Sequence, residues 1–130
     1  DLERIGDHAS DIAELILRIK SEHAYHIVKH LPVMAASANA MVHDAIEAFI
    51  NQDLDSAMEI IERDDEVDTL FNQVKDDVIH LLKSSPDQAD QGIDLLMVAK
   101  YLERIGDHAV NVCEWTQFSK TGALKNVRIM

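Results

Sequence analysis

Apolar residues recur every three or four positions along most of this chain, which is the spacing of one buried face of an α-helix. The alternation typical of β-strands is absent. The pattern predicts four helices, over residues 1–21, about 32–50, 54–83 and 86–121. Short connections make neighbouring helices antiparallel, so we expect an all-α fold of up-and-down helices. In it, the last three helices form a three-helix bundle and the first helix packs beside it.

Local signals place several helix ends. Asp53 follows a short polar turn and is expected to cap the third helix. Before the fourth helix, Ser85 is expected to act as the cap, with Pro86 in the first turn and Gln88 completing a capping box. Gly122 is expected to end that helix.

An eight-residue segment occurs twice. Residues 2–9 read Leu-Glu-Arg-Ile-Gly-Asp-His-Ala, and the same residues return at 102–109. Packing alone would keep the apolar positions but not the four charged or titratable ones. The identity therefore indicates two copies of one helical unit and a site that is made twice. We expect 1–21 to be the last helix of a truncated first repeat, 22–122 a complete second repeat, and 123–130 a tail.

The composition limits the classes of ligand, partner and compartment that fit this chain. The 130 residues carry a net charge of −12, which disfavours nucleic acid and suits a cation or a basic partner. Cys113 is the only cysteine, so no internal disulfide can form and a reducing compartment is expected. No apolar run reaches the roughly 20 residues that a membrane-spanning helix needs.

Carboxylates form stripes on the predicted helices. Glu103, Asp107 and Asn111 are four residues apart, so their oxygens fall along one strip of the helix surface. Like charges at this spacing destabilise a helix unless they are neutralised, and a bound cation would neutralise them. Oxygen donors favour hard metal ions. The first copy of the motif carries the matching stripe of Glu3, Asp7 and Asp11.

A second acidic pair, Asp64 and Asp68, flanks the apolar face of the third helix. The two stripes fit a metal site on the outer surface of the bundle, between the third and fourth helices. Taken alone, an acidic pair of this kind is also typical of a solvated helix face. Gly6 and Gly106 would destabilise a helix interior, because glycine has a low helix propensity. We expect that a neighbouring element approaches each of them closely, which would explain why glycine is present.

Other residues receive structural predictions. His8 and His108 lie off the carboxylate strip and are expected to form hydrogen bonds at the packing edge. His26 and His30 have a spacing that can chelate a metal, although adventitious binding or none is the favoured interpretation. The larger apolar side chains are expected to fill the core, among them Trp115, Tyr101, Met34, Met41, Met58 and Met97.

Residues 102–115, Leu-Glu-Arg-Ile-Gly-Asp-His-Ala-Val-Asn-Val-Cys-Glu-Trp, resemble the signature of the PhoU family. The resemblance implies tandem three-helix repeats that bind metal clusters through acid-x-x-x-Asp motifs. The matching positions are Asp64, Asp68, Glu103 and Asp107, with Asn111 in the extended motif. Glu3 and Asp7 match half of a second site, where Asp11 departs from the Asn of the motif.

The resemblance further implies a non-enzymatic, cytoplasmic regulator of phosphate uptake, peripheral to the membrane at most. It would act as an adaptor between the phosphate ABC transporter ATPase subunit and a phosphate sensor histidine kinase. It would hold the phosphate-starvation response off when phosphate is plentiful. The metal could be Fe, Mn, Mg, Ca or Zn, and a homodimer is compatible with the resemblance.

Two other functions compete with this one. A ferritin-like di-metal oxidoreductase would place Glu-x-x-His pairs in a four-helix core, but Glu103 precedes His108 by five residues and the acids avoid the apolar face. A metal-free scaffold would instead use its acidic strips to dock basic helices, with binding that weakens in salt.

Overall fold

The computed structural model describes residues 2–18 and 22–129, and this part of the chain consists of helices joined by short turns. Its elements are α1 (Leu2–Arg18), α2 (Glu22–Ile27), α3 (Leu31–Asn51), α4 (Leu54–Glu62), α5 (Asp64–Ser84), the 3₁₀ turn η1 (Pro86–Gln88) and α6 (Ala89–Ile129). The all-α prediction is confirmed. No helix in the described ranges is long and apolar enough to cross a membrane.

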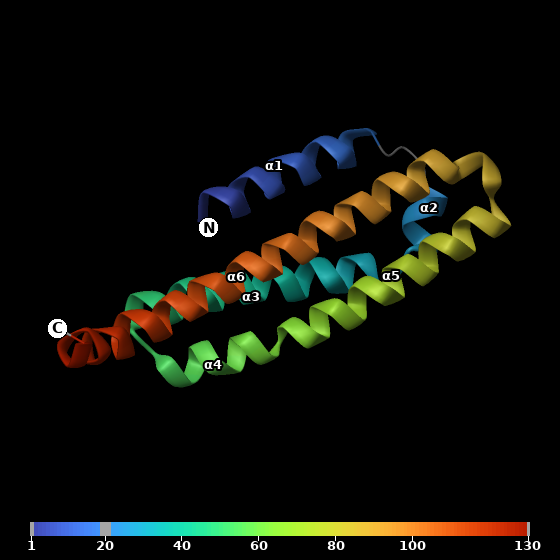
Figure 1. Cartoon of the computed structure of the whole chain (residues 1–130). Coiled ribbons are helices and arrows are strands. Elements are labelled where there is room, and N and C mark those ends of the chain that lie inside the picture. Colours follow the sequence, from blue (N-terminus) through green and yellow to red (C-terminus); the bar gives the residue numbers. More distant parts are fainter. Residues whose placement is uncertain (1, 19–21, 130) are drawn as a thin grey trace.

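The long helix α6 is the centre of the arrangement. It packs against α1, α3, α4 and α5, and the helices run up and down along a common direction (Figure 1). The pair α4 and α5 forms one rod of the three-helix bundle, with α3 and α6 as the other two. Helix α1 lies along the outside of α6 and antiparallel to it. The division into two repeats at residue 22 stays a prediction.

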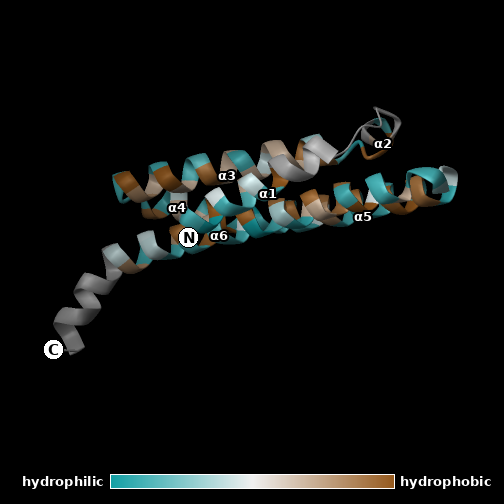
Figure 2. Ribbon diagram, turned by 90° about the horizontal axis from the view of Figure 1, so that it is seen from above, coloured by the Kyte–Doolittle hydropathy of each residue, from teal (hydrophilic) through white to brown (hydrophobic). Residues whose placement is uncertain are grey.

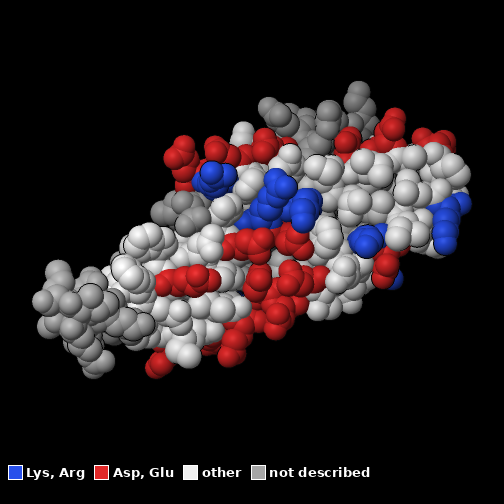
Figure 3. All heavy atoms as spheres, in the orientation of Figure 1, with Lys and Arg blue, Asp and Glu red and all other residues white. Residues whose placement is uncertain are grey.

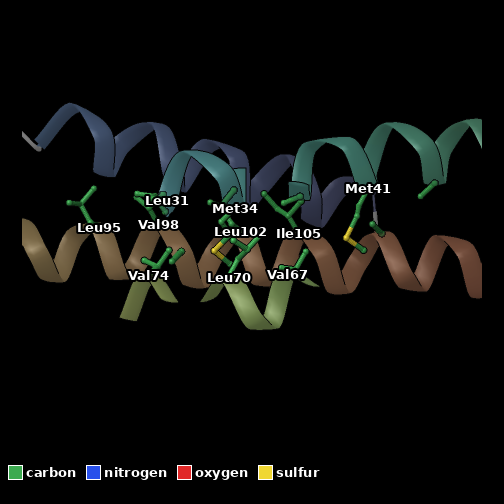
Figure 4. Close-up of a cluster of buried hydrophobic side chains, with 14 of the residues drawn as sticks. Leu31, Met34, Met41, Val67, Leu70, Val74, Leu95, Val98, Leu102 and Ile105 are labelled. Carbon is green, nitrogen blue, oxygen red and sulfur yellow. The ribbon is translucent and has the colours of Figure 1, made fainter. Parts of the chain in front are cut away.

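The core consists of aliphatic side chains from α3, α5 and α6 that point toward one another (Figure 4). Hydrophobic and hydrophilic residues follow each other at helical spacing along these elements (Figure 2), so each helix buries one side. Among the described residues, Thr116 is the one buried polar side chain, and its hydroxyl donates to the Val112 carbonyl. The predicted inward positions Met34, Met41, Val67, Val74 and Leu81 are fully buried.

Several large apolar side chains predicted to be buried are exposed instead. Trp115 is 57% exposed, Met58 54% and Met97 40%. Trp115 follows Val112 by three positions, but Cys113 and Thr116 are the neighbours that face inward on this turn of α6, which turns the indole outward. Phe49, expected inward on α3, is also exposed.

The helix ends agree only partly with the prediction. Asp53 caps α4 by accepting a hydrogen bond from the Ser56 backbone N–H at 3.1 Å, as expected. The predicted third helix is interrupted at Arg63, where bonds to residues three positions away tighten the turn. Ser85 makes no side-chain cap, because the chain forms a 3₁₀ turn there before α6 begins. Helix α6 continues through Gly122, since glycine permits a left-handed cap without imposing one.

Candidate metal centre

Four of the predicted ligands are brought to one place on the surface. Asp64 and Asp68 lie in the first turns of α5, and Glu103 and Asp107 lie on the middle of α6, which packs beside it. Figure 3 shows acidic groups gathered over this part of the face, with basic groups next to them. The acids are outside the hydrophobic core, whereas a ferritin-like site would place them inside it.

The electrostatics of these carboxylates show that they share one environment. Burial, together with the charges of Asp68 and Asp107, raises the pKa of Asp64 to about 6. The pKa of Asp68 is raised by burial and by Glu103. The pKa of Asp107 is raised by burial, Glu103 and Asp68, although the residue as a whole is exposed. Each carboxylate therefore disfavours ionisation of its neighbours, and an added cation would relieve that cost.

Asp64 shows this cost of ionisation most clearly. Its Oδ1 atom is buried and accepts no hydrogen bond within the described structure. Gly106 lies against it: a Cβ added to this glycine would meet Asp64 Oδ1 and Val67 Cγ1 at 3.6 Å each. The missing side chain leaves room beside a carboxylate oxygen that has no donor. A hard cation would satisfy such an oxygen, so the residues present fit a metal ion.

The four carboxylates are neighbours, but they do not form a single tight cage. Among the described residues, only His43, Asp44 and Glu47 bring three potential ligand atoms within 4.8 Å of one another. This group on α3 was not predicted, although its spacing of one and four residues was visible in the sequence. It is largely exposed, and Arg63 already binds Asp44 at 2.8 Å.

A lysine provides a positive charge inside the acidic group. Lys100 Nζ lies 2.7 Å from Glu103 Oε1, at a spacing of three residues on α6. Its charge partly offsets the rise in the pKa of both Asp68 and Asp107. The prediction missed this residue, although the helical spacing from Glu103 was sufficient to place the two side chains together.

The other predicted ligands lie elsewhere on α6 and on α1, and their role stays a prediction. Asn111 lies one turn beyond Asp107 and is partly buried, lining an open pocket of about 390 Å³ beside Trp115. Glu3, Asp7 and Asp11 are on α1, and none of them is among the charges that shift the pKa of the α5–α6 carboxylates. A second site on α1 stays a prediction.

The two copies of the repeated segment meet each other. The rings of His8 and His108 stack with centroids 5.5 Å apart and an interplanar angle of 21°. Because α1 and α6 are antiparallel, contact between equivalent residues means that an approximate twofold axis passes through this point. Burial lowers the pKa of both imidazoles, and for His8 the neighbouring His108 lowers it further.

Two details of the repeated segment differ from the prediction. The ring of His8 stacks on His108, and its buried Nδ1 has no hydrogen-bond partner in the described structure. The expected close approach is absent at Gly6, where an added Cβ would meet nothing within 4 Å, and at Gly106 a Cβ would make only ordinary van der Waals contacts. Away from this seam, His30 Nδ1 lies 2.7 Å from Asp77 Oδ2, which gives it a structural partner.

The fold and the site together define a helical-bundle protein with an acidic seam on its surface. Residues 31–116 match the family described as "PhoU domain". The chain therefore belongs to the PhoU family.

Curated relatives carry the same family name. The chain is 40% identical over 122 residues to the phosphate-specific transport system accessory protein PhoU homolog of Clostridium acetobutylicum, covering 94% of this chain and 56% of that protein. It is 34% identical over 129 residues to PhoU homolog 1 of Thermotoga maritima, covering 98% of this chain and 55% of that one. The chain thus spans little more than half the length of these relatives.

A solved structure is also similar. The crystal structure of the phosphate transport system regulatory protein PhoU from Streptococcus pneumoniae superposes with a TM-score of 0.78 at 28% sequence identity. The match covers 93% of this chain and 57% of that chain.

Proposed function

We propose that this chain is the metal-binding part of a regulator of phosphate uptake and phosphate-starvation signalling. Asp64, Asp68, Glu103 and Asp107 would hold the ion. The observation that carries the proposal is the buried, unpartnered oxygen of Asp64 among carboxylates that raise its pKa. A bound ion would supply the positive charge that these residues lack. The names of the relatives connect such a chain with phosphate-specific transport.

In this proposal the chain acts without catalysis, in the cytoplasm, as an adaptor between the ATPase subunit of the phosphate ABC transporter and the phosphate sensor kinase. Its acidic surface supports docking to basic partner surfaces, since the net charge is −12. Hard ions such as Fe, Mn, Mg or Ca suit the oxygen donors best, and Zn is also compatible with carboxylates.

The metal claim is tested by elemental analysis of the purified protein and of two variants, Asp68→Ala and Asp107→Ala. Both variants are expected to lose bound metal by at least about tenfold, because each removes a charged ligand. Asp76→Ala removes an exposed carboxylate from the same helix α5 and serves as the matched control. Equal metal content in all four proteins would refute the proposed site.

The adaptor role needs its own measurement. Binding to the transporter's ATPase subunit is measured by calorimetry, with and without a chelator and inorganic phosphate. We expect chelation to weaken binding. Binding that survives chelation but falls with added NaCl would instead support the metal-free scaffold, whose acidic faces dock basic helices.

A further inference from the structure

Lys100 is positioned differently from the other cations near the carboxylate group. Its ammonium lies 2.7 Å from Glu103 Oε1, a side chain that is only 18% exposed, and 5.5 Å from the centre of the Phe71 ring on α5. The lysine therefore spans the seam between α6 and α5. Its charge also acts on Asp68 and Asp107, one on each helix.

The neighbouring arginines are engaged elsewhere. The Arg63 guanidinium binds Asp44 on α3 at 2.8 Å. The Arg104 guanidinium lies 6.0 Å from the centre of the Tyr101 ring. Among the described residues, Lys100 is the cation whose charge acts on both Asp68 and Asp107.

We infer that Lys100 is a tethered competing cation that sets the metal affinity of the site. Its ammonium occupies a position beside Glu103 that a metal ion would share, so binding a metal breaks the Lys100–Glu103 ion pair and brings two positive charges close together. The lysine thereby raises the ion concentration at which the carboxylates become occupied. The inference rests on the proposed metal site and adds the residue that regulates it.

The experiment titrates metal-free protein with Mn²⁺ alone by isothermal calorimetry, after removal of bound ions with a chelator. Lys100→Gln removes the charge and keeps part of the aliphatic stem that lies near Phe71. We expect it to bind Mn²⁺ about tenfold more tightly, since the repulsion between the ammonium and the ion is lost. Lys100→Arg keeps the charge and is expected to remain within about threefold of the unmodified protein.

Lys83→Gln makes the same charge change on an exposed residue at the far end of α5 and should leave the affinity within about twofold. If Lys100→Gln binds Mn²⁺ no more tightly than the unmodified protein, or more weakly, the inference is overturned while the metal site stands. If only Lys100→Gln binds Mn²⁺, the inference is supported, because the lysine then excludes the ion. If neither protein binds, both the metal site and the inference fail.

Discussion

At the scale of single residues, Asp64 carries an electrostatic cost that no hydrogen bond or ion pair in the described structure compensates. Its carboxyl is partly buried, one oxygen has no donor, and four neighbouring carboxylates oppose its ionisation. Burial is the first cause of its raised pKa. The residue is thus better suited to binding an ion than to stabilising the folded chain.

This cost predicts an unusual pH dependence. Because the folded pKa of about 6 exceeds the ordinary 3.8, the folded state binds more protons than the unfolded state between those values. Its contribution therefore lowers stability as pH rises from about 4 to 6. In metal-free protein, Asp64→Asn should raise the free energy of unfolding by about 1 kcal/mol at pH 7, because solvent screening reduces the effect of the pKa shift, and change it little at pH 4.

Urea denaturation in the presence of a chelator, at pH 4.5 and pH 7, measures this difference. Asp76→Asn, on the exposed side of α5, is the control and should change stability by about the same small amount at both pH values. An Asp64→Asn variant that gains nothing at neutral pH would show that the buried oxygen is satisfied in solution.

At the scale of the helices, the sequence predicted positions better than it predicted ends. The spacing of carboxylates placed Asp68 and Asp107 on the facing sides of α5 and α6, because helical geometry fixes the direction of each side chain. The turn at Arg63 was not predictable, since its partner Asp44 is 19 residues away on another helix. The exposure of Trp115 depends on which helices cover that turn of α6. The spacing of apolar residues along one helix does not indicate which neighbours will cover it.

Gly106 connects helix stability with the site. Ala fits here, since its Cβ would be at ordinary contact distance from Asp64 and Val67. Gly106→Ala should therefore stabilise metal-free protein by up to about 1 kcal/mol through helix propensity, yet weaken Mn²⁺ binding because the methyl group fills the space beside Asp64 Oδ1. Thermal unfolding and calorimetry measure the two effects.

Gly6→Ala is the matched control, because the same residue in the first copy of the motif meets nothing within 4 Å. It should bring a similar gain in stability with unchanged Mn²⁺ affinity at the α5–α6 group. A loss of stability in Gly106→Ala, or equal Mn²⁺ affinity in both variants, would contradict the role given to this glycine.

At the scale of the whole molecule, the net charge of −12 opposes compaction. Raising NaCl from about 0.02 to 0.5 M shortens the screening length and should raise the thermal midpoint of metal-free protein by several degrees. Micromolar Mn²⁺ should produce a rise that equal ionic strength of NaCl does not reproduce. Identical curves with both salts would mean that screening, rather than ion binding, relieves the repulsion.

The general location of the acidic α5–α6 group was predictable at this scale, and its detailed geometry was not. Antiparallel neighbours follow from short connections, so the two acidic stripes had to approach each other. How far apart the oxygens lie depends on side-chain rotamers and on Lys100, which responds to the summed charge of both helices. That balance is a property of the assembled bundle rather than of any one segment.

The stacking of His8 on His108 has a consequence for how the sequence of this chain can evolve. Equivalent positions of the duplicated segment contact each other between α1 and α6, so a substitution in either copy changes the surroundings of the other. Divergence of one copy alone would disturb a surface that both share, whereas the flanking stretches can drift independently. Such mutual dependence would keep residues 2–9 and 102–109 identical. The next equivalent positions, 10 and 110, already differ.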